Sequence, residues 1–114
     1  MNVTVLEDLP TFVIKAHGRF EERDCQVLQE VLEKSIRSLC RQVLIDLNDL
    51  QNITIAGQRV LLSYSSQLQA VHRPLVFYNI NPAVMAAFED SGMVKVIYIA
   101  HSLKEAQAHF LKLK

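Results

Sequence analysis

The chain has little of what small proteins use for cross-links, tight loops and large aromatic anchors. Its 114 residues include no tryptophan, two cysteines, three glycines and three prolines. The glycines stand far apart, so they cannot form a glycine-rich phosphate loop. Cys25 and Cys40 lack the spacing of a metal or redox motif, and we interpret both as reduced thiols on or near one helix. A chain of this length can bury enough surface to fold without a disulfide or a metal.

Excess charge of one sign and long apolar runs are also missing. Twelve Lys and Arg balance twelve Asp and Glu, so the net charge gives no reason to expect a nucleic-acid partner. No apolar run approaches the roughly 20 residues of a membrane span, and no signal peptide is evident at the N-terminus. We therefore expect a cytoplasmic protein without membrane insertion. Its length predicts a single domain over residues 1–114.

Recognisable catalytic patterns are lacking as well. No Gly-x-Ser-x-Gly elbow occurs, and Cys25 has no base evident in the sequence. No two of the four histidines are four residues apart, so no zinc site is encoded on one helix face. Asp46 and Asp49 could hold a metal near a strand end, but loop and capping roles explain them more simply. We expect no enzymatic activity, cofactor or metal.

What the chain does contain is an alternation of short apolar runs and amphipathic stretches. The first two runs flank a turn and predict a hairpin. The expected strands are 3–6, 12–16, 43–47, 75–80 and 96–99, and the expected helices are 24–39, 55–71, one from Pro82 to Gly92 and one opening at Ser102. The resulting order, β-β-α-β-α-β-α-β-α, predicts an α/β fold. It would be a mixed, mostly parallel sheet of about five strands with about four helices.

Several residues are typical of helix ends. Asp24 is predicted to be the N-cap of the first helix. Asn81 followed by Pro82 indicates another helix start, Ser102 with Glu105 forms a capping-box pattern, and Gly92 is a natural stop.

Projection at about 100° per residue predicts which side of each helix is buried. On helix 55–71 the buried stripe comprises Val60, Leu61, Tyr64, Leu68 and Val71. Opposite to it lie Ile55, Leu62, Gln58, Arg59, Ser66 and Gln69. The apolar face of helix 24–39 comprises Val27, Leu28, Val31, Leu32, Ser35, Ile36 and Leu39. In the last helix Leu103, Ala106 and Phe110 are expected to face inward.

The segment from Val43 to Leu62 resembles the signature of the STAS domain, the family of anti-sigma-factor antagonists and their relatives. In that family an apolar strand ends in Asp-Leu, followed by a polar loop. Asp-Ser-Ser-Gly or Asp-Ser-Thr-Gly then stands at the head of a helix. The matching residues here are Asp46-Leu47, the loop 48–52, Ile53 and Thr54-Ile55-Ala56-Gly57. Gly18-Arg19, Asn81 to Val84, Asp90 to Gly92 and Ser102 to Ala106 resemble further pieces of the family pattern.

The motif at the helix head departs from the family at three of four positions. Thr54 stands at the family's Asp, Ile55 at its phosphorylated Ser and Ala56 at the next hydroxyl residue, while Gly57 is retained. Ile55 and Ala56 have no hydroxyl, so the resemblance implies that the usual phosphoswitch is absent. Thr54 is best explained as a helix N-cap, and its phosphorylation stays open as an alternative.

The resemblance implies a small module that binds a protein and regulates a signalling or transcription partner. The expected partner is an anti-sigma-factor-like serine kinase ATPase or a signalling complex, and the expected contact residues are Ile55, Gln58, Arg59, Leu62 and Ser66. Alternatively, Ile55 packs against the preceding loop or a neighbouring helix. Two other functions stay open: an accessory subunit of a transporter, such as a lipid-transport ATP-binding-cassette system, and a sensor of nucleotides or other small ligands at the helix start. A homodimer is also open.

Overall fold

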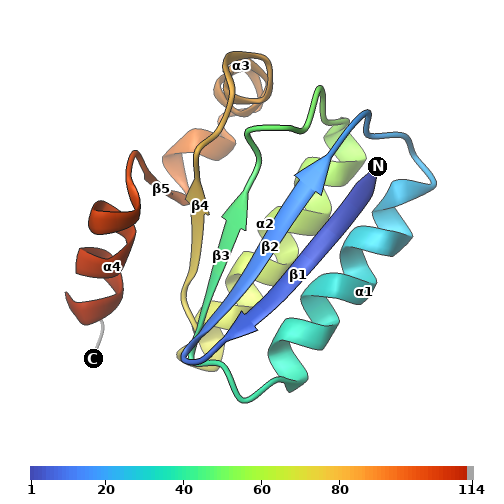
Figure 1. Ribbon diagram of the computed structural model, residues 1–114. Helices are drawn as coiled ribbons and strands as arrows, with labels where there is room; N and C mark the ends of the chain where they lie inside the picture. The colour runs from blue at the N-terminus through green and yellow to red at the C-terminus, as the bar shows by residue number, and fades with distance from the viewer. Residues whose placement is uncertain (113–114) are drawn as a thin grey trace.

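The computed structural model describes residues 1–112, which form one five-stranded sheet and four α-helices (Figure 1). The α/β fold predicted from the sequence is confirmed. In chain order the elements are β1 (Asn2–Asp8), β2 (Thr11–His17), α1 (Asp24–Arg37), β3 (Gln42–Asp46), α2 (Ile55–Ala70), β4 (Leu75–Tyr78), α3 (Pro82–Ser91), the 3-10 turn η1 (Met93–Lys95), β5 (Tyr98–Ala100) and α4 (Leu103–Lys112).

The strands lie side by side in chain order, from β1 to β5. β1 and β2 form the predicted antiparallel hairpin, with Val5 opposite Ile14. Every later neighbour is parallel, and Ile14, Ile45 and Phe77 line up across β2, β3 and β4. Because parallel neighbours need crossover connections, helices return the chain across the sheet after β2, β3 and β4.

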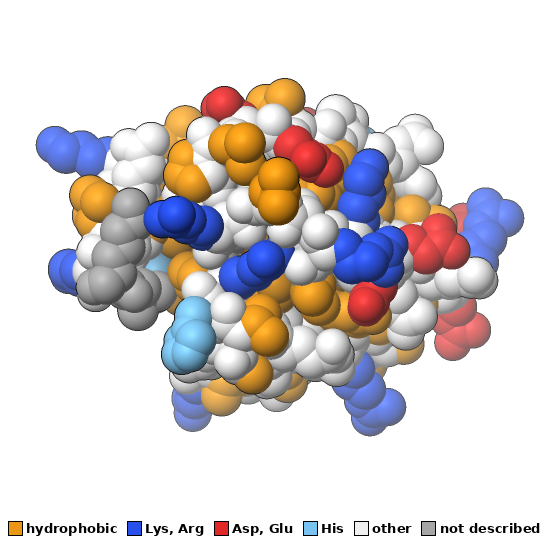
Figure 2. All heavy atoms as spheres, turned by 90° about the horizontal axis from the view of Figure 1, so that it is seen from below, with side chains coloured by type: hydrophobic (Ala, Val, Ile, Leu, Met, Phe, Trp, Pro, Cys, Tyr) orange, Lys and Arg blue, Asp and Glu red, His pale blue; other side chains and the backbone are white. Residues whose placement is uncertain are grey.

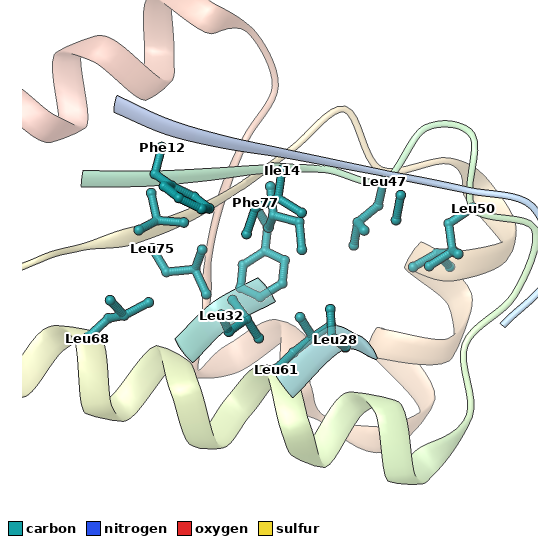
Figure 3. Packing of buried hydrophobic residues seen from close by; sticks show 14 of the residues in the cluster. Phe12, Ile14, Leu28, Leu32, Leu47, Leu50, Leu61, Leu68, Leu75 and Phe77 are labelled. Atoms are coloured by element: carbon teal, nitrogen blue, oxygen red, sulfur yellow. The ribbon is translucent and has the colours of Figure 1, made fainter. Parts of the chain in front are cut away.

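The main core lies between one face of the sheet and the helices α1 and α2; Figure 1 shows α2 behind the strands and α1 beside β1. Leu28 and Leu32 of α1 and Leu61 of α2 approach Phe77 of the sheet (Figure 3). The ring of Phe77 also meets Phe88 of α3 edge to face, at 5.9 Å between centroids. On the other face, α4 forms a smaller core that comprises Leu44, Val76, Ala100, Ala106 and Phe110.

The predicted helix ends after β4 are confirmed by their hydrogen bonds. The side chain of Asn81 accepts from the backbone N–H of Val84 at 3.0 Å, and that of Ser102 accepts from Glu105 at 3.0 Å. Gly92 ends α3 with a φ of 81°, which glycine adopts without strain. The strand predicted at 96–99 begins later, at Tyr98, because the 3-10 turn η1 follows Gly92 directly.

The sequence predicted Asp24 as the N-cap of α1, and this prediction is wrong. Arg23 occupies that position without a side-chain cap, and Asp24 is buried in the first turn. Its carboxylate accepts from the backbone N–H of Glu21 at 2.8 Å and lies 3.3 Å from the terminal amine of Met1. These contacts, the Glu21 bond foremost, lower the pKa of Asp24. The prediction failed because the stabilising donors come from the preceding turn and from the start of the chain.

Four apolar side chains assigned to the buried sides of helices are exposed: Val27, Leu39, Val71 and Leu103. Leu39 lies beyond the end of α1, Val71 is the C-cap of α2, and Leu103 opens α4. A wheel projection cannot tell where a helix passes beyond its neighbours, so it overestimates burial at the ends. None of the helices in the described part of the chain is long and apolar enough to cross a membrane.

Candidate functional site: the head of helix α2

The loop between β3 and α2 is held by backbone contacts from distant parts of the chain. Gly18 donates its N–H to the carbonyl of Asp49 at 3.0 Å and accepts from the N–H of Gln51 at 2.8 Å. Its φ of 85° makes glycine favourable there. The side-chain amide of Asn81 donates to the carbonyls of Leu47, Asn48 and Leu50. These contacts fix the point at which α2 begins.

Thr54 is the N-cap of α2, as the sequence predicted. Its Oγ1 accepts a hydrogen bond from the backbone N–H of Gly57 at 3.0 Å. This bond satisfies one of the N–H groups that a helix start leaves without an intrahelical partner. The only hydroxyl in the four-residue motif therefore has a structural role.

Gly57 permits close packing beneath the first turn of α2. A Cβ at this position would lie 2.7 Å from Cε1 and Cζ of Phe20 and 3.0 Å from Cγ1 of Ile53. Phe20 is itself buried, so its ring has little room to move. Sequence reasoning identified this residue only as the retained glycine of the family motif. It missed the packing role because Phe20 is distant in the sequence and nothing local indicates the contact.

The outward side of α2 carries four of the predicted contact residues. Ile55 is 55% exposed, and Arg59, Leu62 and Ser66 are exposed as well. We call these four residues the outer α2 surface. Ile55 therefore does not fill a core position, although a buried packing role was one alternative.

Gln58 was predicted to lie on the same outward side, and this prediction is wrong. Its side chain is only 5% exposed and accepts a hydrogen bond from Oγ of Ser91, at the end of α3. Gln58 stands about 60° from buried Leu61 on the helix. The end of α3 covers this flank, so the buried arc of α2 is wider than its apolar stripe.

The acidic residues near the site hold the loop. Asp46 accepts from the backbone N–H of Asn48 at 3.0 Å, and a carboxylate oxygen of Asp49 lies 3.6 Å from Nδ1 of His17. Within residues 1–112, no three His, Cys, Asp or Glu side chains are grouped so that they could hold a metal ion. The head of α2 thus presents an apolar and hydrogen-bonding surface.

Neither cysteine belongs to the outer α2 surface. Cys25 is half-buried, Cys40 is buried, and both are free thiols, as predicted. Burial raises the pKa of the Cys25 thiol, which disfavours the reactive thiolate.

Comparison with known proteins supports the resemblance stated from the sequence. The family model of the STAS domain matches residues 3–106. BtrV of Bordetella bronchiseptica, a candidate anti-sigma factor antagonist, is 39% identical over 93 residues. The match covers 82% of this chain and 80% of that protein.

Solved structures share the fold at lower identity. A variant of RsbS from Moorella thermoacetica has a TM-score of 0.79 at 20% identity, covering 99% of this chain and 97% of that one. An anti-sigma factor antagonist of Mycobacterium paratuberculosis has a TM-score of 0.83 at 15% identity, and the match covers 96% of this chain and 92% of that one. SpoIIAA in its unphosphorylated form has a TM-score of 0.78 at 18% identity, and the match covers 97% of both chains. The chain belongs to the STAS domain family, with the fold of the anti-sigma factor antagonists.

Proposed function

We propose that this STAS domain is a non-catalytic, cytoplasmic binding module that docks on a protein partner through the outer α2 surface. The partner would be an anti-sigma-factor-like serine kinase ATPase or a signalling complex that contains one. The observation that carries the proposal is Ile55, which stands 55% exposed where the family resemblance expects the phosphorylated serine.

An exposed isoleucine at a helix head contributes little to the fold but can contribute to an interface. Removing the exposed part of its side chain from water on binding would add about 1 kcal/mol. Leu62 lies further along the same helix face, and Arg59 and Ser66 supply hydrogen-bonding groups beside the two apolar side chains. A small apolar centre with polar neighbours is the usual composition of a protein interface.

The proposed binding has no serine phosphoswitch. Ile55 and Ala56 carry no hydroxyl, and the Thr54 hydroxyl already accepts the capping bond from Gly57. In a domain with a serine at that position, a phosphate would add about two negative charges at the contact. Binding here is therefore constitutive or controlled on the partner's side.

The test is affinity co-purification of the full chain from its native host, with the bound proteins identified by mass spectrometry. The wild type is compared with Ile55→Lys and with Leu103→Lys. Leu103 is a matched control because it is 50% exposed and lies on α4. We expect a kinase-like ATPase or its complex to be lost with Ile55→Lys and retained with Leu103→Lys. A partner retained by both variants would contradict the proposal, and capture of transporter subunits would favour the transport alternative.

A second experiment tests the missing phosphoswitch separately. The wild type and Ile55→Ser are incubated with ATP and the captured kinase, and their phosphopeptides are mapped. We expect no phosphate within residues 54–57 of the wild type and phosphorylation of the introduced hydroxyl in the variant. Stoichiometric phosphate on wild-type Thr54 would contradict this part of the proposal and leave the docking surface itself intact.

A further inference from the structure

A cavity of about 570 Å³ lies on the far half of α2 from its head. It is bounded by the last turns of α2, the start of β4, the segment from η1 to β5, and α4. The side chains that line it include Gln69, His72, Lys95, Val96, Tyr98 and His109. Its volume falls in the range of small-molecule sites in proteins, about 300–1,000 Å³.

The lining of this cavity is biased in charge. Its ionisable side chains are His72, Lys95, Tyr98 and His109, and none of the described residues that line it is acidic. A neighbouring hollow of about 300 Å³ shares His72 and adds Arg41 and Arg73, again without a described acid. The whole chain has equal numbers of acidic and basic residues, so the bias is local.

Basic side chains are also present at the adjoining end of the molecule. Figure 2 shows that end, where Lys and Arg side chains form a band across the centre, with hydrophobic side chains on both sides and Asp and Glu side chains beside the part of the band away from the cavity side. Arg73 is already engaged, because its guanidinium donates to the carbonyls of Ser35, Ile36 and Ser38 at the end of α1. Lys95 forms no salt bridge with a described carboxylate and supplies a free positive charge at the cavity.

Beside Lys95 the cavity has apolar and aromatic walls. Leu75, Val96 and Ile97 contribute aliphatic surface. The rings of Tyr98 and His109 are stacked, with centroids 3.6 Å apart and an angle of 11° between their planes. Burial, with a smaller effect of Lys112, lowers the pKa of His109, which favours the neutral ring as part of this wall.

We propose that the cavity binds an amphipathic organic anion. Its acidic group would lie near Lys95 and His72, and its apolar body would pack against Val96 and the Tyr98–His109 stack. The combination of a free cation, the absence of described acidic side chains in the lining and an apolar wall favours this class over neutral or cationic ligands. The cavity shares no residue with the outer α2 surface, so the proposed ligand binding can be tested independently of the proposed docking function.

The experiment uses the full chain and 8-anilinonaphthalene-1-sulfonate, a fluorescent amphipathic anion, at low salt. Fluorescence titration and amide chemical-shift mapping are performed on the wild type, Lys95→Glu and the control Lys34→Glu. Lys34 is exposed on α1 and does not line the cavity. We expect one saturable site with shifts centred on residues 69–72 and 95–98, weakened at least about tenfold by Lys95→Glu and little changed by Lys34→Glu. No saturable binding, equal affinity in all three proteins or shifts elsewhere would overturn the proposal.

Two further arms test the chemistry of the ligand. N-phenyl-1-naphthylamine has the same aromatic body without the sulfonate, and we expect it to bind at least about tenfold more weakly than the anion. Equal binding of the neutral probe would refute charge selection. Competition with decanoate and with decyl phosphate then compares acidic groups. Displacement of the probe by either one supports the proposal and identifies the preferred group, whereas displacement by neither contradicts it.

Discussion

The inner and outer sides of the first two turns of α2 differ in what holds them in place. On the inner side, Gly57 is pressed against Phe20, and Gln58 is hydrogen-bonded to Ser91. On the outer side, Ile55 stands in solvent. The inner residues are constrained by the fold, whereas the outer residues are open to change. Substitutions on the two sides should therefore separate stability from binding.

The largest effect is expected at Gly57. Gly57→Ala places a methyl group against the buried ring of Phe20, and overpacking of this kind costs about 1–3 kcal/mol. The gain in helix propensity is only about 1 kcal/mol, so we expect a net loss of up to about 2 kcal/mol in urea denaturation. At its exposed neighbour the preference should reverse, and Ala56→Gly should lose about 1 kcal/mol. A stabilised Gly57→Ala would show that Phe20 relaxes freely.

The next largest loss of stability is expected at Gln58. Gln58→Ala removes a buried hydrogen bond to Ser91, and we expect a loss of about 1.5 kcal/mol in the free energy of unfolding. The exposed Gln67 of the same helix is the control, and its alanine variant should stay within about 0.5 kcal/mol of the wild type. In a double-mutant cycle with Ser91→Ala, the coupling should be about 1 kcal/mol. No coupling would mean that Gln58 stabilises the protein by packing alone.

Thr54 should have a smaller effect. Thr54→Ala deletes the hydroxyl that accepts from Gly57, and loss of an N-cap costs about 1 kcal/mol. Thr54→Ser keeps the hydroxyl and should retain most of the stability in the same denaturation measurement. If the two variants were equally unstable, the methyl group of Thr54 rather than its capping bond would be the important part.

Ile55 should have the smallest effect on stability. Because its side chain is largely in solvent, Ile55→Lys should change the free energy of unfolding by less than about 0.5 kcal/mol. The same variant is expected to lose the captured partner, so a thermal melt must accompany the binding assay. A strongly destabilised Ile55→Lys would break the distinction between the two sides of α2.

Sequence reasoning succeeded where the signal was local. Asn81 with Pro82, Gly92 and Ser102 mark helix ends because each satisfies backbone groups within a few residues of itself. The projection of α2 also placed Ile55 and Leu62 correctly on the exposed side. For Gln58 it failed because the wheel gives directions around one helix axis and contains no neighbouring helix.

Other errors have the same origin in contacts outside the helix concerned. Asp24 carries a typical capping side chain, yet its carboxylate turns back to Glu21 and the amine of Met1. The cavity beside Tyr98 and His109 had no signal in the sequence, since its lining comes from α2, β4, the segment from η1 to β5, and α4. Scattered basic residues form a biased lining only after these elements are brought together.

The sequence alone determined the order of the elements, the hairpin and most of the helix caps of this STAS domain. These features depend on hydrophobic periodicity and on hydrogen bonds between near neighbours in the chain. Only the tertiary structure decided that Gly57 must accommodate Phe20, that Gln58 is buried by α3, and that basic side chains gather around a cavity. Close packing and charge clustering depend on distances between elements, and one-dimensional periodicity carries no record of those distances.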